Sequence, residues 1–134
     1  MKTVFELNNG LPFDRTLFER MQKTASDILN NATKEEYTQA IVLLTSKGKE
    51  YCAVIENALS EDKIEESSLL GTLISEDDTE IYRILCMWQD GGIDLPSYTF
   101  RKMLCESNSK NLESGIFVKT NDGYSVIKLS VTLK

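Results

Sequence analysis

The sequence predicts an α+β domain in which one β-α-β-β unit occurs twice. Each of the only two prolines follows a leucine and precedes a segment whose apolar residues recur with helical spacing. Each of these segments is followed by two β-rich runs that flank a glycine turn. The chain of 134 residues suits one domain, 1–134. We therefore expect a mixed or antiparallel sheet of about six strands with helices packed on one face of it.

The first unit, residues 1–58, opens with "TVFEL" as a strand and "NNG" as a turn. Asp14 is then available as a helix N-cap, and Leu17, Met21 and Ile28 lie on one apolar helix face. The run "QAIVLLTSKGKEYCAVIEN" follows, in which two β-rich halves flank "SKGK". This order predicts a helix and then a hairpin.

The second unit, residues 79–134, repeats this order. A strand "EIYRILCMWQ" leads through "DGG" to a helix "YTFRKMLCES" capped by Ser97, and a hairpin turns at "NDG". The two hairpins can be laid on one another, so we interpret the units as an internal repeat joined by an acidic connector, 59–78. Similar folding rules acting twice remain the alternative.

The two prolines have the same predicted role. Pro12 and Pro96 each stand near a helix start, where the missing N–H has no partner in any case and the fixed φ suits the first turn. The second Leu-Pro segment differs from the first by an extra glycine and by Asp94. Those are the positions at which we expect any functional difference between the halves.

Negative charge is concentrated in the connector. Residues 56–80 hold nine acidic side chains against Lys63 alone, whereas the whole chain has a net charge of −6. The leucines and isoleucines of this segment predict one short amphipathic helix, with Glu65 and Glu66 facing water near its start. Two interpretations stay open: a solvated helix start with an acidic loop, or a docking surface for a basic partner.

Several kinds of chemistry have no support in the sequence. There is no histidine, which excludes a His-dependent triad or metal site. No EF-hand spacing, phosphate loop or Cys-x-x-Cys pair occurs, and the pI of ≈ 4.7 argues against nucleic-acid binding. We expect no catalytic residues, cofactor or metal. Cys52, Cys86 and Cys105 are predicted to be buried thiols, and Trp88 is either a core residue or a binding anchor.

Location is predicted from two absences. The apolar runs are far shorter than the ~20 residues of a membrane span, and the amino terminus "MKTVFELNNG" lacks the apolar core of a secretion signal. Three cysteines without a paired spacing fit a reducing compartment. We therefore expect a cytoplasmic protein with no membrane contact.

In its small size, its acidity and its clusters "EDKIEE" and "SEDDTE", the chain resembles immunity proteins of bacterial contact-dependent inhibition and other polymorphic toxin systems. This resemblance implies a non-catalytic, protein-binding toxin inhibitor whose acidic surface neutralises a basic toxin domain. The contact residues would be Glu61, Asp62, Glu65, Glu66, Glu76, Asp77, Asp78 and Glu80. Two alternatives are a module of structural or regulatory role that self-associates through a sheet edge or an apolar face, for example as a homodimer, and a small enzyme that uses carboxylates or Cys86.

Overall fold

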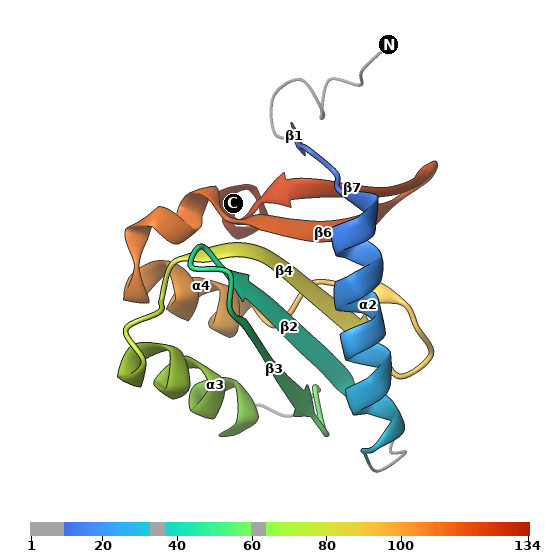
Figure 1. Ribbon diagram of the computed structural model, residues 1–134, viewed down its shortest axis with the longest axis horizontal. Helices are drawn as coiled ribbons and strands as arrows, with labels where there is room; N and C mark the ends of the chain where they lie inside the picture. Colours follow the sequence, from blue (N-terminus) through green and yellow to red (C-terminus); the bar gives the residue numbers. More distant parts are fainter. Residues whose placement is uncertain (1–9, 33–36, 60–63) are drawn as a thin grey trace.

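The structure is a computed structural model that describes residues 10–32, 37–59 and 64–134. Within these residues the chain forms strands, three α-helices and two short 3-10 helices (Figure 1). In chain order they are β1 (Gly10–Leu11), α2 (Arg15–Asn30), β2 (Gln39–Thr45), β3 (Glu50–Ile55), α3 (Ile64–Ser75), β4 (Ile81–Trp88), β5 (Ile93–Asp94), α4 (Tyr98–Ser107), η1 (Ser109–Glu113), β6 (Gly115–Thr120), β7 (Gly123–Lys128) and η2 (Leu129–Leu133).

The strands form one open, mixed sheet of seven strands. The order is β1-β7-β6-β4-β2-β3, and the two-residue strand β5 pairs with β4 outside this path. The β4–β6 pair is parallel, and every other pair is antiparallel. Because α4 lies in the chain between β4 and β6, the parallel pair is a β-α-β crossover.

Helices cover both faces of this sheet. Met21 and Ala25 of α2 pack with Val42 of β2 on one face, whereas Leu69 of α3 and Leu104 of α4 pack with the opposite side (Figure 1). Every residue of β2 is buried, because successive side chains of this central strand point into two separate apolar layers.

Local sequence signals explain where the helices begin. The Asp14 carboxylate accepts a hydrogen bond from Leu17 N at 3.1 Å, and Ser97 Oγ accepts one from Phe100 N at 3.1 Å. Both predicted N-caps are therefore confirmed, as are the α+β class and the two hairpins. Gly48 and Gly123 have φ of +87° and +137°, which explains glycine at both hairpin turns.

The structure differs from the prediction in three details. The helices pack on both faces of the sheet rather than on one. Cys52 is exposed, since it lies on the outer side of β3, and only Cys86 is a fully buried thiol. Glu66 is buried instead of facing water. The predicted strand "TVFEL" lies outside the described residues, and the internal repeat stays a prediction.

The helices that the structure describes are also informative about membranes. None of them combines the length and the apolar character needed to cross a lipid bilayer.

Candidate functional site

The starts of α3 and α4 meet at a buried carboxylate. Glu66, in the first turn of α3, is only 3% exposed. Ser97, immediately before α4, donates its hydroxyl hydrogen to Glu66 Oε1 at 2.9 Å. The same hydroxyl oxygen accepts from Phe100 N, so it caps α4 and holds Glu66 at once. One serine thus ties together two helix starts that lie 31 residues apart in the chain.

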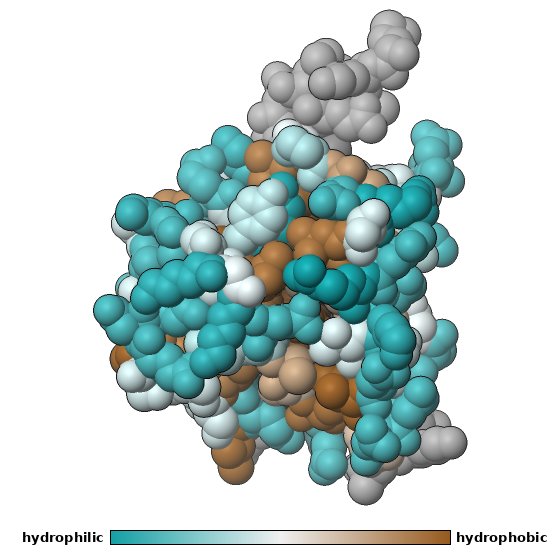
Figure 2. Space-filling view, viewed as in Figure 1, coloured by the Kyte–Doolittle hydropathy of each residue, from teal (hydrophilic) through white to brown (hydrophobic). Residues whose placement is uncertain are grey.

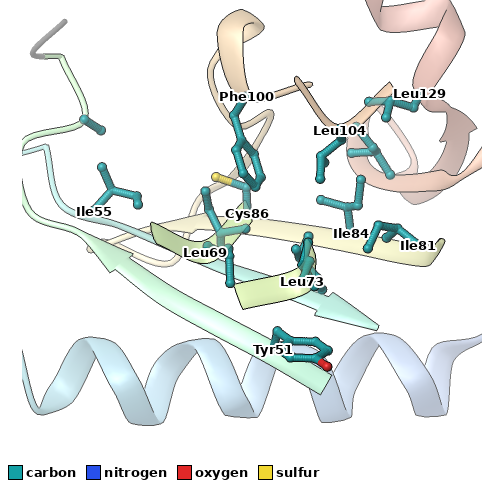
Figure 3. Close-up of a cluster of buried hydrophobic side chains, with 14 residues drawn as sticks. Tyr51, Ile55, Leu69, Leu73, Ile81, Ile84, Cys86, Phe100, Leu104 and Leu129 are labelled. Carbon is teal, nitrogen blue, oxygen red and sulfur yellow. The ribbon is translucent and has the colours of Figure 1, made fainter. Parts of the chain in front are cut away.

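Apolar side chains and one thiol form the floor beneath this pair. Cys86 of β4 belongs to the same buried cluster as Leu69 and Phe100, all visible in Figure 3. Burial raises the pKa of the Cys86 thiol, and the negative charges of Asp94 and Glu66 raise it further. This pKa shift favours the neutral thiol, which makes Cys86 a poor nucleophile.

Asp94 orients the Trp88 ring beside the buried cluster. The indole Nε1–H of Trp88 donates to Asp94 Oδ2 at 2.8 Å, and Leu95 N donates to Asp94 Oδ1 at 2.7 Å. The Trp88 ring also packs against the buried cluster that contains Cys86. Asp94 is one of the two features that distinguish the second Leu-Pro segment from the first, and here it fixes the orientation of an aromatic ring.

Arg101 holds the segment before α4 through two hydrogen bonds to backbone carbonyls. Its Nε donates to Pro96 O at 2.9 Å and its Nη1 donates to Thr132 O at 2.8 Å. Partial burial lowers the pKa of this guanidinium, which nevertheless stays a cation at neutral pH. The loop that carries Ser97 is thereby attached to the carboxyl-terminal segment.

A pocket of ≈ 530 Å³ opens beside Trp88, at the ends of β3 and β4. It is lined by Tyr37, Leu59, Trp88, Gln89 and Asp90. Tyr37 and Trp88 meet nearly edge to face, with ring centroids 6.5 Å apart. Figure 2 shows apolar surface beside the end of β3, and a second apolar area near β6 and β7, with hydrophilic side chains around both.

Backbone hydrogen bonds hold the walls of this pocket together. Ala58 N donates to Tyr37 O at 2.9 Å, and Gln89 N donates to Thr38 O at 3.0 Å. Gln89 Oε1 is buried and has no hydrogen-bond partner among the described residues. A flat ligand in this pocket could therefore stack against the aromatic rings of Tyr37 and Trp88.

The acidic residues predicted as a contact surface do not form one cluster. Glu61 and Asp62 lie outside the described residues. Glu65 and Glu66 are at the start of α3, and the other four follow its end. As a contact surface for a partner, the set stays a prediction.

The four acids after α3 have local partners. Glu76 accepts from Lys49 Nζ at 3.0 Å, and Glu80 lies 3.6 Å from Lys110 Nζ. Asp78 is buried and accepts from Thr45 Oγ1 at 3.0 Å. The backbone carbonyl of Asp77 accepts from a lysine. Two of these four acids, Glu76 and Glu80, are thus ion-paired with lysines of the fold.

The described acidic residues do not form a metal site. Among residues 10–32, 37–59 and 64–134, no three His, Cys, Asp or Glu side chains are grouped so that they could hold a metal ion. The pair formed by Glu66 and Ser97 offers a carboxylate and a hydroxyl. It is suited to hydrogen bonding and proton transfer.

No family model and no curated protein matches this sequence. Solved structures do match its shape. Cytidine deaminase from Mycobacterium leprae is similar over 87% of this chain and 96% of its own, with a TM-score of 0.64 and 20% identity. The fold is that of the cytidine deaminases.

Two further cytidine deaminases share this fold. The enzyme from Mycobacterium tuberculosis covers 87% of this chain and 93% of its own, with a TM-score of 0.61 and 14% identity. The enzyme from Burkholderia pseudomallei covers 84% of this chain and 93% of its own, with a TM-score of 0.60 and 12% identity. At these identities the likeness establishes the cytidine deaminase fold.

The cytidine deaminase fold corrects the functional predictions. The resemblance to toxin-immunity proteins was wrong, and so was the hypothesis of a non-catalytic inhibitor with a basic toxin as its partner, because the structural neighbours are enzymes named for a nucleoside. The expectation that the chain is not an enzyme is contradicted by the same neighbours. The homodimer stays a prediction.

Sequence reasoning recognised Ser97 only as a helix cap and did not connect it with Glu66. One signal was available. Glu66 precedes Leu69 by three residues and Leu73 by seven, which places it on the buried stripe of α3 rather than on the solvent side. Tyr37 and Gln89 had no such signal, because their place in the pocket depends on strands that meet only in the folded chain.

Proposed function

We propose that this protein binds a pyrimidine nucleoside, with the base in the pocket beside Trp88 and with Glu66 as the acid-base group of the site. The observation that carries the proposal is the buried Glu66 carboxylate held by Ser97 at the start of α4, within a fold shared with cytidine deaminases. The substrate class named for the neighbours supports the choice of ligand.

The pocket has the features that a nucleobase requires. Its aromatic wall, Tyr37 and Trp88, offers ring faces and edges on which a base can stack. Gln89 and Asp90 add polar side chains to the lining, and such groups can form hydrogen bonds with the edge of a base. A volume of ≈ 530 Å³ falls within the range of small-molecule sites.

Trp88 links the pocket with the carboxylate. It lines the pocket and also packs on the cluster that contains Cys86 and Phe100, directly under the start of α4. Leu69 of α3 belongs to the same cluster, so a base stacked on Trp88 would lie beside the part of the core on which the Glu66 helix packs. A carboxyl group beside a bound base can accept a hydrogen bond from it or exchange a proton with it.

Titration calorimetry with cytidine, deoxycytidine and uridine tests the binding proposal. We expect saturable binding that weakens in Trp88→Ala, since one base–aromatic stack is worth about 1–3 kcal/mol. The control is Tyr82→Ala, because Tyr82 is another aromatic residue of β4 but lies outside the pocket. Absence of binding by all three nucleosides, or equal losses in the two variants, would contradict the proposal.

The role of Glu66 is tested by Glu66→Gln, which keeps the shape of the side chain but removes its charge. We expect weaker nucleoside binding and loss of any ammonia release that accompanies it. Glu65→Gln, one residue earlier in α3, is the matched control. Equal behaviour of the two variants would remove Glu66 from the proposed site.

We also propose that the protein works in the cytoplasm. Cys52, Cys86 and Cys105 are all free thiols, in keeping with a reducing compartment. Fractionation of the native cell with an antibody against the chain tests this location. Recovery from the periplasmic or extracellular fraction would contradict it.

A further inference from the structure

The cytidine deaminase fold raises the question of zinc. Zinc deaminases hold the metal with a His or Cys two residues before a conserved Glu, and with the two cysteines of a Pro-Cys-x-x-Cys segment. In this chain Glu66 lies in the first turn of α3, and Pro96 precedes the cap of α4. The hydrogen bond from Ser97 to Glu66 brings these two helix starts together as that arrangement requires.

By this spacing, the three ligand positions are Ile64, Ser97 and Phe100. Ile64 carries only hydrocarbon and is 74% exposed. Phe100 fills its position with an aromatic ring that is fully buried. Ser97 offers a neutral hydroxyl that is already engaged with Glu66 and with Phe100 N. None of these side chains provides the thiolate or imidazole that Zn²⁺ prefers.

No neighbouring side chain makes up the loss. Cys86 is the thiol beneath the pair, but it is fully buried, and a single thiol cannot hold a zinc ion without further ligands. The chain has no histidine. Within the described residues, 10–32, 37–59 and 64–134, no other group of three His, Cys, Asp or Glu side chains could hold a metal ion. The residues therefore do not fit a zinc ion.

We infer that this chain retains the carboxylate of a zinc deaminase site without the zinc, and that the Ser97 hydroxyl takes the place of the metal centre as the group that positions Glu66. Phe100 occupies part of the remaining space with its ring. The chemistry of the site is then that of a carboxylate and a hydroxyl in an apolar surrounding. This inference rests on the side chains at the helix starts, and it holds whether or not a nucleoside binds.

Metal analysis of the purified full chain is the first test. After incubation with ZnCl₂ and gel filtration, we expect far less than about one zinc ion per chain, the stoichiometry of a single catalytic site. About one zinc per chain in the wild type, reduced in Ser97→Ala or Glu66→Gln, would overturn the inference. No nucleoside is present, so this result is independent of the binding experiment.

The second test restores the ligands. The variant I64C/S97C/F100C should bind about one Co²⁺ per chain, with the near-ultraviolet charge-transfer absorbance of thiolate coordination. The control I64A/S97A/F100A removes the same side chains without adding thiols and should give no such band. A folded cysteine variant that takes up no cobalt would overturn the assignment of these three positions.

Loss of the Phe100 ring could unfold the triple variant, because truncating a buried Phe costs about 3–5 kcal/mol. The variant I64C/S97C keeps that ring and is measured in parallel, with I64A/S97A as its control. We expect weaker cobalt binding with a smaller thiolate band in the cysteine pair alone. Equal cobalt uptake by the cysteine pair and its alanine control would overturn the assignment.

Discussion

Among single residues, Asp78 is a buried carboxylate that lies just after α3. It is 5% exposed and accepts from Thr45 Oγ1 at 3.0 Å and from the Tyr51 hydroxyl at 3.1 Å. The Tyr51 hydroxyl also bonds the Glu76 carboxylate. These contacts attach the β2–β3 hairpin to the segment after α3, so the acids there act first as structural anchors.

Removing one donor from this network should be costly. Thr45→Val keeps the shape of a fully buried side chain but takes away its hydroxyl, which leaves Asp78 with one donor fewer. We expect the free energy of unfolding in urea to fall by about 1–3 kcal/mol. Thr72→Val, on the exposed side of α3, is the control and should change stability little. Similar losses in both variants would contradict an anchoring role.

The lowered pKa of Glu76 predicts how the stability of the protein depends on pH. The hydrogen bond from Tyr51 lowers the pKa of this carboxyl below its ordinary value of 4.5, and the hydrogen bond from Lys49 lowers it further. A carboxyl whose pKa is depressed by folding stabilises the protein above the unfolded pKa, and this contribution is lost as the pH falls through the folded value. The stability advantage of the wild type over Glu76→Gln should therefore be full near neutral pH.

Below pH 4.5 that advantage should shrink, as measured by urea unfolding of both proteins across a pH series. An advantage that stayed constant from neutral to strongly acidic pH would show that the charge of Glu76 contributes nothing to stability. Glu113→Gln provides the comparison, because Glu113 is an exposed carboxylate that pairs with Lys128 near the end of the chain.

At the scale of elements, the two Leu-Pro segments lead into helices by different routes. Pro12 stands two residues before the Asp14 cap of α2, whereas Pro96 immediately precedes the Ser97 cap of α4. The Asp14 cap serves its helix alone. The Ser97 cap also bonds Glu66, so the second segment combines a helix start with a site. Under the proposed function, a functional difference between the two halves would lie here.

The Asp14 cap tests how much an N-cap contributes to the free energy of unfolding. Asp14→Ala should lower the free energy of unfolding by about 0.5–2 kcal/mol, because Leu17 N loses its side-chain acceptor. Asp14→Asn keeps an oxygen acceptor and should recover most of that loss in thermal or urea unfolding. An asparagine variant as unstable as the alanine variant would indicate that Asp14 acts through its charge instead.

At the scale of the whole molecule, the sheet separates two apolar layers. Met21 of α2 is fully buried in one layer and Leu104 of α4 in the other. The central strands β2 and β4 contribute side chains to both layers, for example Val42 to the first and Ile41 to the second. The two layers should therefore unfold together, because neither keeps its sheet if the other is lost.

This cooperativity can be measured with one cavity on each side of the sheet. Met21→Ala and Leu104→Ala should each cost about 2–5 kcal/mol in urea unfolding, and the double variant should show a nearly additive loss. Circular dichroism and Trp88 fluorescence should report the same midpoint in every variant. Two separate transitions, or midpoints that differ between the probes, would contradict a single cooperative unit.

Helix starts and hairpin turns depend on near neighbours in the chain, and these could be predicted from the sequence. The helix caps at Asp14 and Ser97 and the glycine turns at Gly48 and Gly123 act over a few residues, so the predicted helices and hairpins are confirmed. The α+β class follows from their order. The resemblance to immunity proteins failed because acidic composition does not reveal whether a carboxylate is free or buried.

Contacts between residues far apart in the chain could not be predicted from the sequence, because they depend on the tertiary structure. Glu66 and Ser97 are 31 residues apart, and their hydrogen bond exists because α3 and α4 pack on the same face of the sheet. The pocket likewise joins Tyr37, before β2, to Trp88, at the end of β4. Strand order and register place these side chains together, and they result from the burial of two apolar layers at once.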